Sequence, residues 1–471
     1  MTNRKSTKRA LLGSVMAMVL CLAMLVGATF AWFTDTASTN VNKIQAGNLD
    51  VALEMQNADG KWVSAEGKTL DFVKAADAKG EAILWEPGCT YELPALRIRN
   101  NGNLALKYKV IITGINGSAK LNTVIDWTIG DVAMGAEQHL AAGESNAFTI
   151  KGHMQESAGN EYMNESIDGI AITVAATQDT VENDSLGNTY DKDAKYPIVA
   201  MDTLQELINN ATEPVSAKLE GNIAGSLTVP QGKDVTLDLN GFTLTGGDSH
   251  AILNHGTLCI KDSSGNGKIV ASKANTSALR NAAVCVIDGG TFTRAAGVDN
   301  KWHTVENFGT MTFNGGKVIA EDGQSFAIVN GWNYINPGEQ KATMTINNIE
   351  MEAGPNGFKN CAGGTLTMNN GTLHCTGYWG LSNDSTGVAT INGGKIISDK
   401  YVAISNGGAK MEINGGTFTG PQGSLYVQNY AQGTVVMGGS YGNETVEFMR
   451  NYCPEGYTAT LKDGMVVVSK D

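Results

Sequence analysis

The sequence predicts an all-β protein made of two different modules, an antiparallel β-sandwich followed by a solenoid of stacked parallel coils. In the second half of the chain, one short pattern returns every 23 to 30 residues. In the first half that pattern is absent, and short segments of alternating apolar and polar residues stand between turn clusters. Glycine is abundant, with 57 residues, proline is scarce, with 9, and charged residues make up only 17%. This composition is typical of a turn-rich β protein.

The repeat is clearest between Gly380 and Gly416. Asn383 and Asn406 are each followed by a polar turn and then by a strand that ends in Ile-Asn-Gly-Gly, at 391–394 and 413–416. A unit this short cannot bury its own apolar side chains, so it must stack on copies of itself.

The asparagine returns in eight coils, and an apolar residue stands two positions before each copy, which indicates an inward-facing stripe. Stacked coils lie about 4.8 Å apart, so identical amides can hydrogen-bond along the stack. Gly-Gly pairs mark a corner whose backbone angles a Cβ resists. We therefore predict a structural ladder of Asn254, Asn281, Asn307, Asn330, Asn360, Asn383, Asn406 and Asn429.

Coil length, asparagine ladder and glycine corners over about 215–450 together resemble the pectate-lyase-like superfamily. The resemblance implies a right-handed parallel β-helix, a fold that hosts lyases, hydrolases, adhesins and inert stalks alike. The predicted module spans 201–471. Asp202 begins a short amphipathic helix that would cap the open end, with Asp202 as N-cap and Gln205 three residues on. A hairpin of 457–461 and 465–468 would close the other end.

Residues 32–178 form the predicted sandwich. Its expected strands are 49–55, 91–99, 104–113, 147–150 and 170–176. Residues 179–200 read as an acidic linker. Five acids there leave calcium as an alternative to a solvated linker, but their spacing matches no calcium loop, so we expect no cofactor and no metal site.

Residues 1–31 read as a signal peptide. A basic start precedes an apolar run from Leu11 to Phe30, and small residues precede a cleavage point between Ala31 and Trp32. The alternative is that this run is retained as a membrane anchor. No LPxTG-like motif follows, so we expect an extracellular or cell-surface protein without covalent attachment to the wall.

Two stretches near the start, Gly27–Asp35 and Ile44–Val51, resemble the TasA/camelysin family, and Pro87-Gly88, 99–108 and 175–178 fit its later landmarks. The resemblance covers about 27–180. It implies a jelly-roll domain that Gram-positive bacteria secrete through a dedicated signal peptidase, in a family that includes fibre-forming biofilm matrix proteins. The segment from Trp32 then either folds into its own sandwich or completes the sheet of a neighbouring subunit.

Some camelysin relatives carry a metallopeptidase label, which these residues do not support. The chain has no His-Glu-x-x-His, and His153 reads as a solvated loop residue. Without the signal, six cysteines remain. Cys259 and Cys285 occupy matching places in adjacent coils, so they either stack or bridge, or they stay as two buried thiols. No cysteine or histidine cluster has metal-site spacing.

Acids recurring at one coil position would indicate catalysis. Asp238, Asp262 and Asp288 come nearest, but Asn314, Asn392 and Asn414 fill the same slot in other coils, which favours a turn role. We assign no catalytic residue. Five residues before the ladder stand three aromatics that strand parity points outward, either onto glycans or against long turns such as 331–341. These candidate glycan-binding aromatics are Trp302, Tyr378 and Tyr401.

The formal net charge of −13 makes nucleic acid a poor partner. We expect a secreted surface or biofilm-matrix protein with a structural or adhesive role. The sandwich would support export and fibre assembly, and the β-helix would be a stalk or binding module. Expected partners are other copies of the chain, cell-surface or host glycans, and signal peptidase during export. The alternative is an extracellular polysaccharide lyase or glycoside hydrolase acting through the β-helix.

Overall fold

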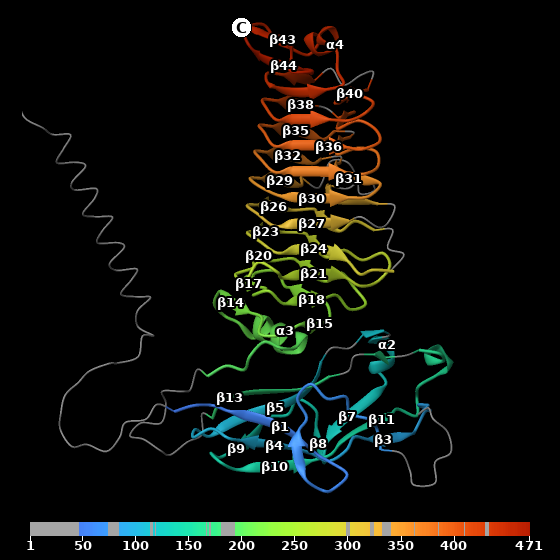
Figure 1. Cartoon of the computed structure of the whole chain (residues 1–471), viewed down its shortest axis with the longest axis vertical. Helices are drawn as coiled ribbons and strands as arrows, with labels where there is room; N and C mark the ends of the chain where they lie inside the picture. The colour runs from blue at the N-terminus through green and yellow to red at the C-terminus, as the bar shows by residue number, and fades with distance from the viewer. Residues whose placement is uncertain are drawn as a thin grey trace, which may run out of the picture. The chain divides into compact units, whose positions relative to one another are not determined.

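A computed structural model describes most of the chain from residue 47 onward. The described ranges are 47–73, 84–113, 116–117, 119–165, 167–168, 171–179, 194–297, 302–320, 325–331, 341–361, 363–384, 386–408, 410–428 and 433–471. Residues 48–471 form one compact unit. The predicted all-β class is confirmed, with antiparallel sheets first and a parallel solenoid after them (Figure 1).

The N-terminal part contains short antiparallel sheets with strand orders β10-β4-β1-β2, β3-β11-β7-β8, β13-β5-β9 and β12-β6. Its elements are β1 (Val51–Gln56), β2 (Trp62–Ser64), β3 (Thr90–Glu92), β4 (Leu96–Asn100), β5 (Leu106–Thr113), β6 (Asn116–Gly117), α2 (Ala119–Asn122), β7 (Ile125–Ile129), β8 (Val132–Ala133), β9 (Gln138–Leu140), β10 (Ser145–Phe148), β11 (Ile150–Met154), the 3-10 turn η1 (Asn160–Tyr162), β12 (Ile167–Asp168) and β13 (Ala171–Gln178).

Alternation along these strands builds the sandwich core. Leu96 and Ile98 of β4 and Leu106 and Tyr108 of β5 are fully buried in one cluster. The buried Tyr108 hydroxyl accepts a hydrogen bond from Asn146 Nδ2 at 2.9 Å, so its polar atom is satisfied.

The predicted strand 91–99 is in fact two strands in different sheets. β3 pairs with β11, whereas β4 pairs with β1 and β10. Pro94 lies between them, and a proline has no N–H for the ladder, so the chain changes sheets there. His153 lies on strand β11, not in the predicted loop, and its Nδ1 lies 2.9 Å from Thr90 Oγ1.

Most solenoid coils contribute one strand to each of three sheets, which we call sheets I, II and III; the strands from successive coils pair in parallel, and β44 and β43 extend sheet II antiparallel. Sheet I contains β14 (Val215–Lys218), β17 (Asp234–Asp238), β20 (Thr257–Lys261), β23 (Val284–Ile287), β26 (Thr310–Phe313), β29 (Thr343–Ile346), β32 (Thr365–Met368), β35 (Val388–Ile391), β38 (Lys410–Ile413) and β41 (Thr434–Val436). Sheet II contains β15 (Ile223–Ala224), β18 (Thr243–Thr245), β21 (Lys268–Ala271), β24 (Thr291–Arg294), β27 (Lys317–Ala320), β30 (Glu350–Ala353), β33 (Thr372–Cys375), β36 (Lys395–Ser398), β39 (Thr417–Thr419) and β42 (Gly439–Gly442), then β44 (Met465–Lys470) and β43 (Tyr457–Lys462). Sheet III contains β16 (Leu227–Val229), β19 (Ile252–Asn254), β22 (Leu279–Asn281), β25 (Val305–Asn307), β28 (Phe326–Asn330), β31 (Asn356–Asn360), β34 (Leu381–Asn383), β37 (Ile404–Asn406) and β40 (Leu425–Val427).

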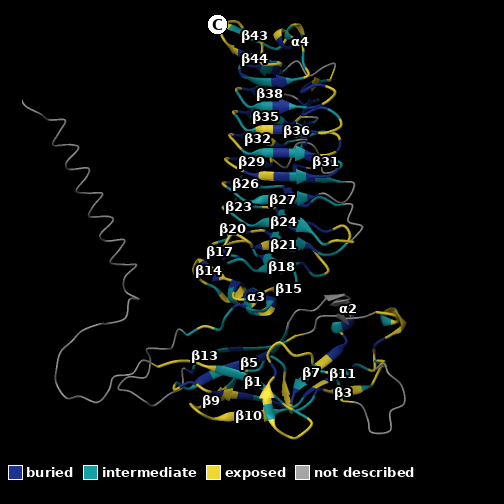
Figure 2. Ribbon diagram, in the orientation of Figure 1, coloured by how far each residue is buried: buried dark blue, intermediate teal, exposed yellow. Residues whose placement is uncertain are grey.

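Inward side chains from all three sheets form one continuous apolar core, which Figure 2 shows as buried segments inside the stack. Within β26, for example, Met311 and Phe313 are fully buried while Thr310 and Thr312 face outward. No single coil could bury such residues alone, so the stack is the folding unit.

Buried asparagines connect successive coils. The Nδ2 of each asparagine from Asn254 to Asn383 donates to the Oδ1 of the next one at 2.7–2.9 Å, through Asn281, Asn307, Asn330, Asn360 and Asn406. Asn406 ends the series by donating to Thr434 Oγ1. The residue opposite Asn406 in the next coil is Val427, two positions before the predicted Asn429, which lies outside the described residues.

The corner between sheets I and II uses the glycine pair. Its second glycine has a positive φ in several coils, for example 93° at Gly394 and 118° at Gly416. At Gly394 an added Cβ would lie 2.7 Å from the Gly371 carbonyl oxygen of the coil below. A left-handed backbone and the neighbouring coil therefore both require glycine.

Both ends of the solenoid are covered. Helix α3 (Met201–Asn210) buries Leu204 and Ile208 against the first coil. The prediction that Asp202 is the N-cap is wrong, because Ala200 is the N-cap residue and makes no side-chain capping hydrogen bond. The Gln205 amide holds the backbone of Thr228 instead, with bonds of 2.8 and 2.9 Å. At the other end, β43 and β44 form the predicted hairpin, and helix α4 (Val446–Arg450), which was not predicted, packs beside it.

Candidate functional site

Two of the three predicted aromatics meet at the turn between sheets II and III. The ring centroids of Tyr378 and Tyr401 lie 6.2 Å apart in an edge-to-face arrangement. Trp379, which was not predicted, lies 5.8 Å from Tyr378 and 6.1 Å from Tyr401. We call Tyr378, Trp379 and Tyr401 the aromatic shelf. Tyr378 is 57% exposed, so an aromatic surface is open to solvent there.

Ser398 fixes the two tyrosines relative to each other. Its hydroxyl donates to the Tyr378 carbonyl oxygen at 2.7 Å and accepts from the Tyr401 N–H at 3.0 Å. Ser398 ends β36 and is buried, so the turns of two successive coils share one hydrogen-bonding centre. The shelf is therefore positioned by the coil stack itself.

Trp302 does not join this shelf. Its ring packs against His303 at 5.7 Å, in a coil three strands away from Tyr378 within sheet III. Strand parity alone placed all three aromatics outward, but the local turns direct them to different surroundings.

An acidic and basic row crosses sheet II on the strands that lead into the shelf. His374 of β33 lies between Glu352 of β30 and Asp399, which follows β36. Its Nδ1 is 2.7 Å from Glu352 Oε2 and its Nε2 is 3.1 Å from Asp399 Oδ1. The 22 residues from Glu352 to His374 match the local coil period, because the two are register partners, whereas Asp399 lies two residues beyond Ile397, the register partner of His374. That periodicity is the sequence signal that could have revealed the pair of Glu352 and His374.

The two carboxylates favour the charged form of His374. Burial lowers the pKa of His374, but the hydrogen bonds to Asp399 and Glu352 and their negative charges outweigh it, so the pKa is raised above its usual value. As an imidazolium the ring donates from both nitrogens, one to each carboxylate. The row then carries two negative charges and one positive charge beside the aromatic shelf.

A second polar group is buried on the outer side of sheet III. Glu306 is fully buried and accepts a hydrogen bond from Ser277 Oγ at 2.8 Å. Arg280 and His250 each approach it at 3.9 Å. Burial raises the pKa of Glu306, and the bond from Ser277 and the charge of Arg280 oppose that shift. Burial and Arg280 lower the pKa of His250 to about 4. This group acts as an internal polar bridge across coils.

The acids at the start of the solenoid serve the backbone. Asp262 accepts from the N–H groups of Gly241 and Gly267 at 2.8 and 2.7 Å, and Asp238 accepts from those of Asn240 and Ser263. Asp288 instead accepts from the amide of Asn314. Each carboxylate is thus used in a turn or a ladder.

The inferred match between Cys259 and Cys285 is wrong by one residue. Cys285 pairs with Leu258 and faces the core, whereas Cys259 pairs with Val286 and faces outward. Strand parity reverses the side when the register shifts by one. The six cysteines in the described part of the chain are free thiols.

The sandwich contains a cleft of about 730 Å³. Its apolar lining comes from Leu53 of β1, Leu70 and Phe72 of the following segment, and Ile172 and Val174 of β13. Strand β13 pairs with β5 and, among the described residues, has no partner on its other edge. Asp179, which follows β13, is buried and its carboxylate lies 2.8 Å from His139 Nδ1. Asp179, the first residue of the predicted linker, therefore contacts strand β9 of the sandwich.

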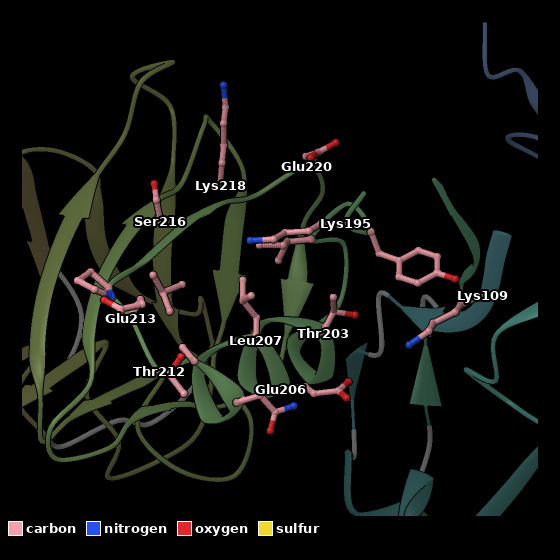
Figure 3. A pocket seen from close by; sticks show the side chains of 16 residues that line it. Lys109, Lys195, Thr203, Glu206, Leu207, Thr212, Glu213, Ser216, Lys218 and Glu220 are labelled. Carbon is pink, nitrogen blue, oxygen red and sulfur yellow. The ribbon is translucent and has the colours of Figure 1, made fainter. Parts of the chain in front are cut away.

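A hollow beside α3 is lined by charges of both signs (Figure 3). The charged residues of its lining include Glu206 of α3, Glu213, Glu220, Lys195 and Lys218. This mixture favours no single ligand charge. In the described part of the chain, no group of three or more histidine, cysteine or acidic residues could hold a metal ion.

Comparison with known families gives one match. A family model described as "Camelysin metallo-endopeptidase" matches residues 6–58. The match covers the start of the chain and reaches β1, but not the solenoid. No curated protein and no solved structure matches the chain. The predicted cleavage point, Ala31 and Trp32, lies inside the matched range and outside the described residues. None of the described helices is long and apolar enough to cross a bilayer.

Proposed function

We propose that this is a secreted structural protein of a bacterial cell surface or biofilm matrix, in which the sandwich assembles subunits and the solenoid displays a glycan-binding surface. The camelysin family match at residues 6–58 supports the first part, because the TasA/camelysin resemblance implies secretion and fibre formation. The pectate-lyase-like resemblance supports the second as a choice of fold only.

The observation that carries the proposal is the apolar cleft lined by Leu53, Leu70, Phe72 and Val174. An extended apolar segment placed there buries its side chains against Leu70, Phe72 and Val174. The segment Trp32–Asn40 begins with Trp-Phe and would be freed by cleavage after Ala31. Inserted into the cleft of a neighbouring subunit, it would link copies into a fibre.

The solenoid is suited to display. Its coils are joined by parallel sheets and by the buried asparagine series, so it behaves as a rigid rod. The aromatic shelf presents an exposed Tyr378 ring beside Tyr401. Aromatic faces stack on sugar rings, which makes cell-surface or host glycans the expected partners.

Electron microscopy of the chain from residue 32 onward tests the assembly. Concentration-dependent filaments are expected, and a version that lacks Trp32–Asn40 should remain monomeric. Val174→Glu places a charge in the cleft and should also abolish filaments. Val132→Glu is the matched control, because Val132 lies at a 39% exposed position on β8, away from the cleft. Monomers of the intact chain at every concentration would contradict the assembly proposal.

Glycan arrays test the shelf separately. Tyr378→Ala should weaken glycan retention, while Tyr426→Ala, which removes another exposed tyrosine from the solenoid, should leave it unchanged. Equal retention by both variants would rule out the shelf as the contact surface.

A second function, polysaccharide cleavage, is favoured by the row of Glu352, His374 and Asp399 beside the shelf. Hydrolase or lyase activity would release reducing ends or unsaturated sugars from a polymer. Activity that is lost in His374→Gln, with binding retained, would support this function over display alone.

A further inference from the structure

The outer surface of sheet I carries a repeated motif that neither the shelf nor the sandwich uses. The pattern Thr-x-Thr-apolar-Asn occurs in three consecutive coils, at 310–314, 343–347 and 365–369, and the next coil continues it with Thr390 and Asn392. We call the outward residues of these four coils the threonine–asparagine face.

The register aligns these residues into straight rows. Thr310 pairs with Thr343, which pairs with Thr365, and Thr312, Thr345, Thr367 and Thr390 form the neighbouring row. Successive threonines within a row are about 4.8 Å apart, and the two rows are about 6.6 Å apart. All of them are exposed or half-buried, so hydroxyl and methyl groups form a regular flat surface.

A second, exposed asparagine ladder borders the threonine rows. Asn347 donates to Asn314, Asn369 to Asn347, and Asn392 to Asn369, each at 2.8 Å, and the ladder continues from Asn414 to Asn392. Each internal amide uses one N–H and one oxygen lone pair within the ladder. One N–H and one lone pair per coil therefore remain directed away from it, as a rail of alternating donors and acceptors.

The threonine–asparagine face carries no charge, although the chain as a whole has a net charge of −13. Ionised residues border it instead, with Asp288 before it and Lys410 and Glu412 after it in the same sheet. The corresponding coils of sheet II carry the ion pair of Lys317 and Glu350. A charged ligand would find no counter-ion on this face. An uncharged ligand can bind there without removing water from any ionised side chain of the face.

The size of the face indicates the kind of ligand. Four coils of five residues cover roughly 20 Å by 15 Å, about 300 Å². A stable protein–protein interface buries about 800 Å² on each partner, so the face is too small to hold a second copy of this chain. A repeating polymer can bind to a smaller area, because successive units of one chain each contact the face and their contacts add.

We infer that the threonine–asparagine face binds the flat side of an uncharged polysaccharide. Sugar hydroxyls both donate and accept, as the amide rail requires, and the threonine methyl groups contact the apolar faces of sugar rings. This surface is separate from the aromatic shelf, which lies at the corner between sheets II and III.

Retention on insoluble polysaccharides tests this inference. The chain from residue 32 onward is mixed with microcrystalline cellulose, chitin and insoluble β-1,3-glucan, and bound protein is measured after sedimentation. Retention on at least one polymer is expected, and it should persist in about 1 M salt because no ion pair is involved. Absence of retention on all three, or release by salt, would overturn the inference.

Two single variants in the same coil locate the surface. Thr367→Lys adds an ammonium group to the face, and water solvates this group in the free protein. When the polymer binds, the ammonium group must either lose that water or keep the polymer away from the face, and both weaken binding. Thr372→Lys makes the same change on sheet II of that coil, between Glu350 and Lys395. Retention should fall about tenfold or more for the first and stay near the unmodified level for the second.

Circular dichroism checks that both variants remain folded, and Tyr378→Ala separates this inference from the proposed function. If Tyr378→Ala abolishes retention while Thr367→Lys does not, the shelf binds the polymer and the face does not. If Thr367→Lys alone abolishes it, the inference stands whether or not the protein forms filaments. Equal loss in Thr367→Lys and Thr372→Lys would contradict it.

Discussion

The sandwich and the solenoid differ in how far apart in the sequence their paired strands lie. In the sandwich, β5 pairs with β13, so Leu106 lies opposite Gln178 across a long stretch of chain. In the solenoid, Asn383 lies opposite Asn406, one coil later. The partner of a solenoid strand is therefore its own copy one period away. A sandwich strand has a partner that no repeat in the sequence identifies.

Buried asparagines show the same contrast. Asn100 in the sandwich is fully buried and donates from Nδ2 to the carbonyl oxygens of Leu104, Leu140 and Ala141, while Gly102 N–H donates to its Oδ1. Asn383 donates to Asn406 and accepts from Asn360, which are repeats of itself. Both amides are satisfied, but only the periodic one can be recognised in a single sequence.

The largest effect that would test this contrast is expected for Asn383→Ala. It removes the hydrogen bonds that Asn383 Nδ2 donates to Asn406 Oδ1 and to the carbonyl oxygens of Gly387 and Lys410, and the one that its Oδ1 accepts from Asn360. We expect a loss of about 3 kcal/mol in the free energy of unfolding of the solenoid. Hydrogen exchange of the neighbouring coils measures it.

Asn392→Ala is the matched control, because Asn392 belongs to the exposed ladder and its neighbours can bond to water. It should cost less than about 0.5 kcal/mol. Fluorescence of Trp62, Trp85 and Trp127, which all lie in the sandwich, should not change in Asn383→Ala. An earlier unfolding of those tryptophans would mean that the two modules unfold together.

The accuracy of the sequence-based prediction follows the same division. The period located the solenoid strands, the inward stripe and the glycine corners. Errors arose where the period changes, as at Val427, which takes the position opposite Asn406, and at Cys259, where a one-residue shift reverses the side. In the sandwich, alternation found β1, β5, β10 and β13 but missed β7 and β9 and gave no strand partners, and Pro94 divided one predicted strand between two sheets.

The candidate site was less predictable, because its members are brought together by the stacking of different coils. Tyr378 and Tyr401 were recognised from their shared position before the ladder. Trp379 and the row of Glu352, His374 and Asp399 do not share that position. The threonine rows have a clear period, but a period alone does not distinguish a binding surface from a solvated face.

The next largest effect concerns acid. Burial, with nearby arginines, lowers the pKa of His250 and that of His303 to about 4. The folded solenoid therefore binds fewer protons than the unfolded chain between about pH 4 and the usual histidine pKa of about 6.5. Stability should therefore fall as the pH decreases through this range, because each histidine must then take up a proton at a buried site. Glu306, whose pKa is raised, opposes the trend, because its contribution decreases as the pH rises.

Thermal unfolding at a series of pH values measures this effect. The double variant His250→Asn and His303→Asn should make the solenoid transition less dependent on pH, while the sandwich transition keeps its own profile. An unchanged pH dependence in the double variant would show that other groups cause the acid sensitivity.

The smallest effect, about 1 kcal/mol, is expected for Ser398→Ala. The change removes the hydroxyl that joins the Tyr378 carbonyl to the Tyr401 N–H, and these two turns lie in successive coils. Because the sheets on either side keep the coils in register, the loss should loosen the turns and not unfold the stack.

Glycan retention through the shelf should weaken by several-fold, while retention through the threonine–asparagine face stays constant. The buried Ser424 hydroxyl lies 2.6 Å from the carbonyl oxygens of both Phe418 and Gly442, outside the shelf, so Ser424→Ala is the control, with a similar stability cost and no change in glycan retention. If both variants weaken glycan retention equally, the shelf depends on the general stability of the solenoid and not on its own hydrogen-bonding centre.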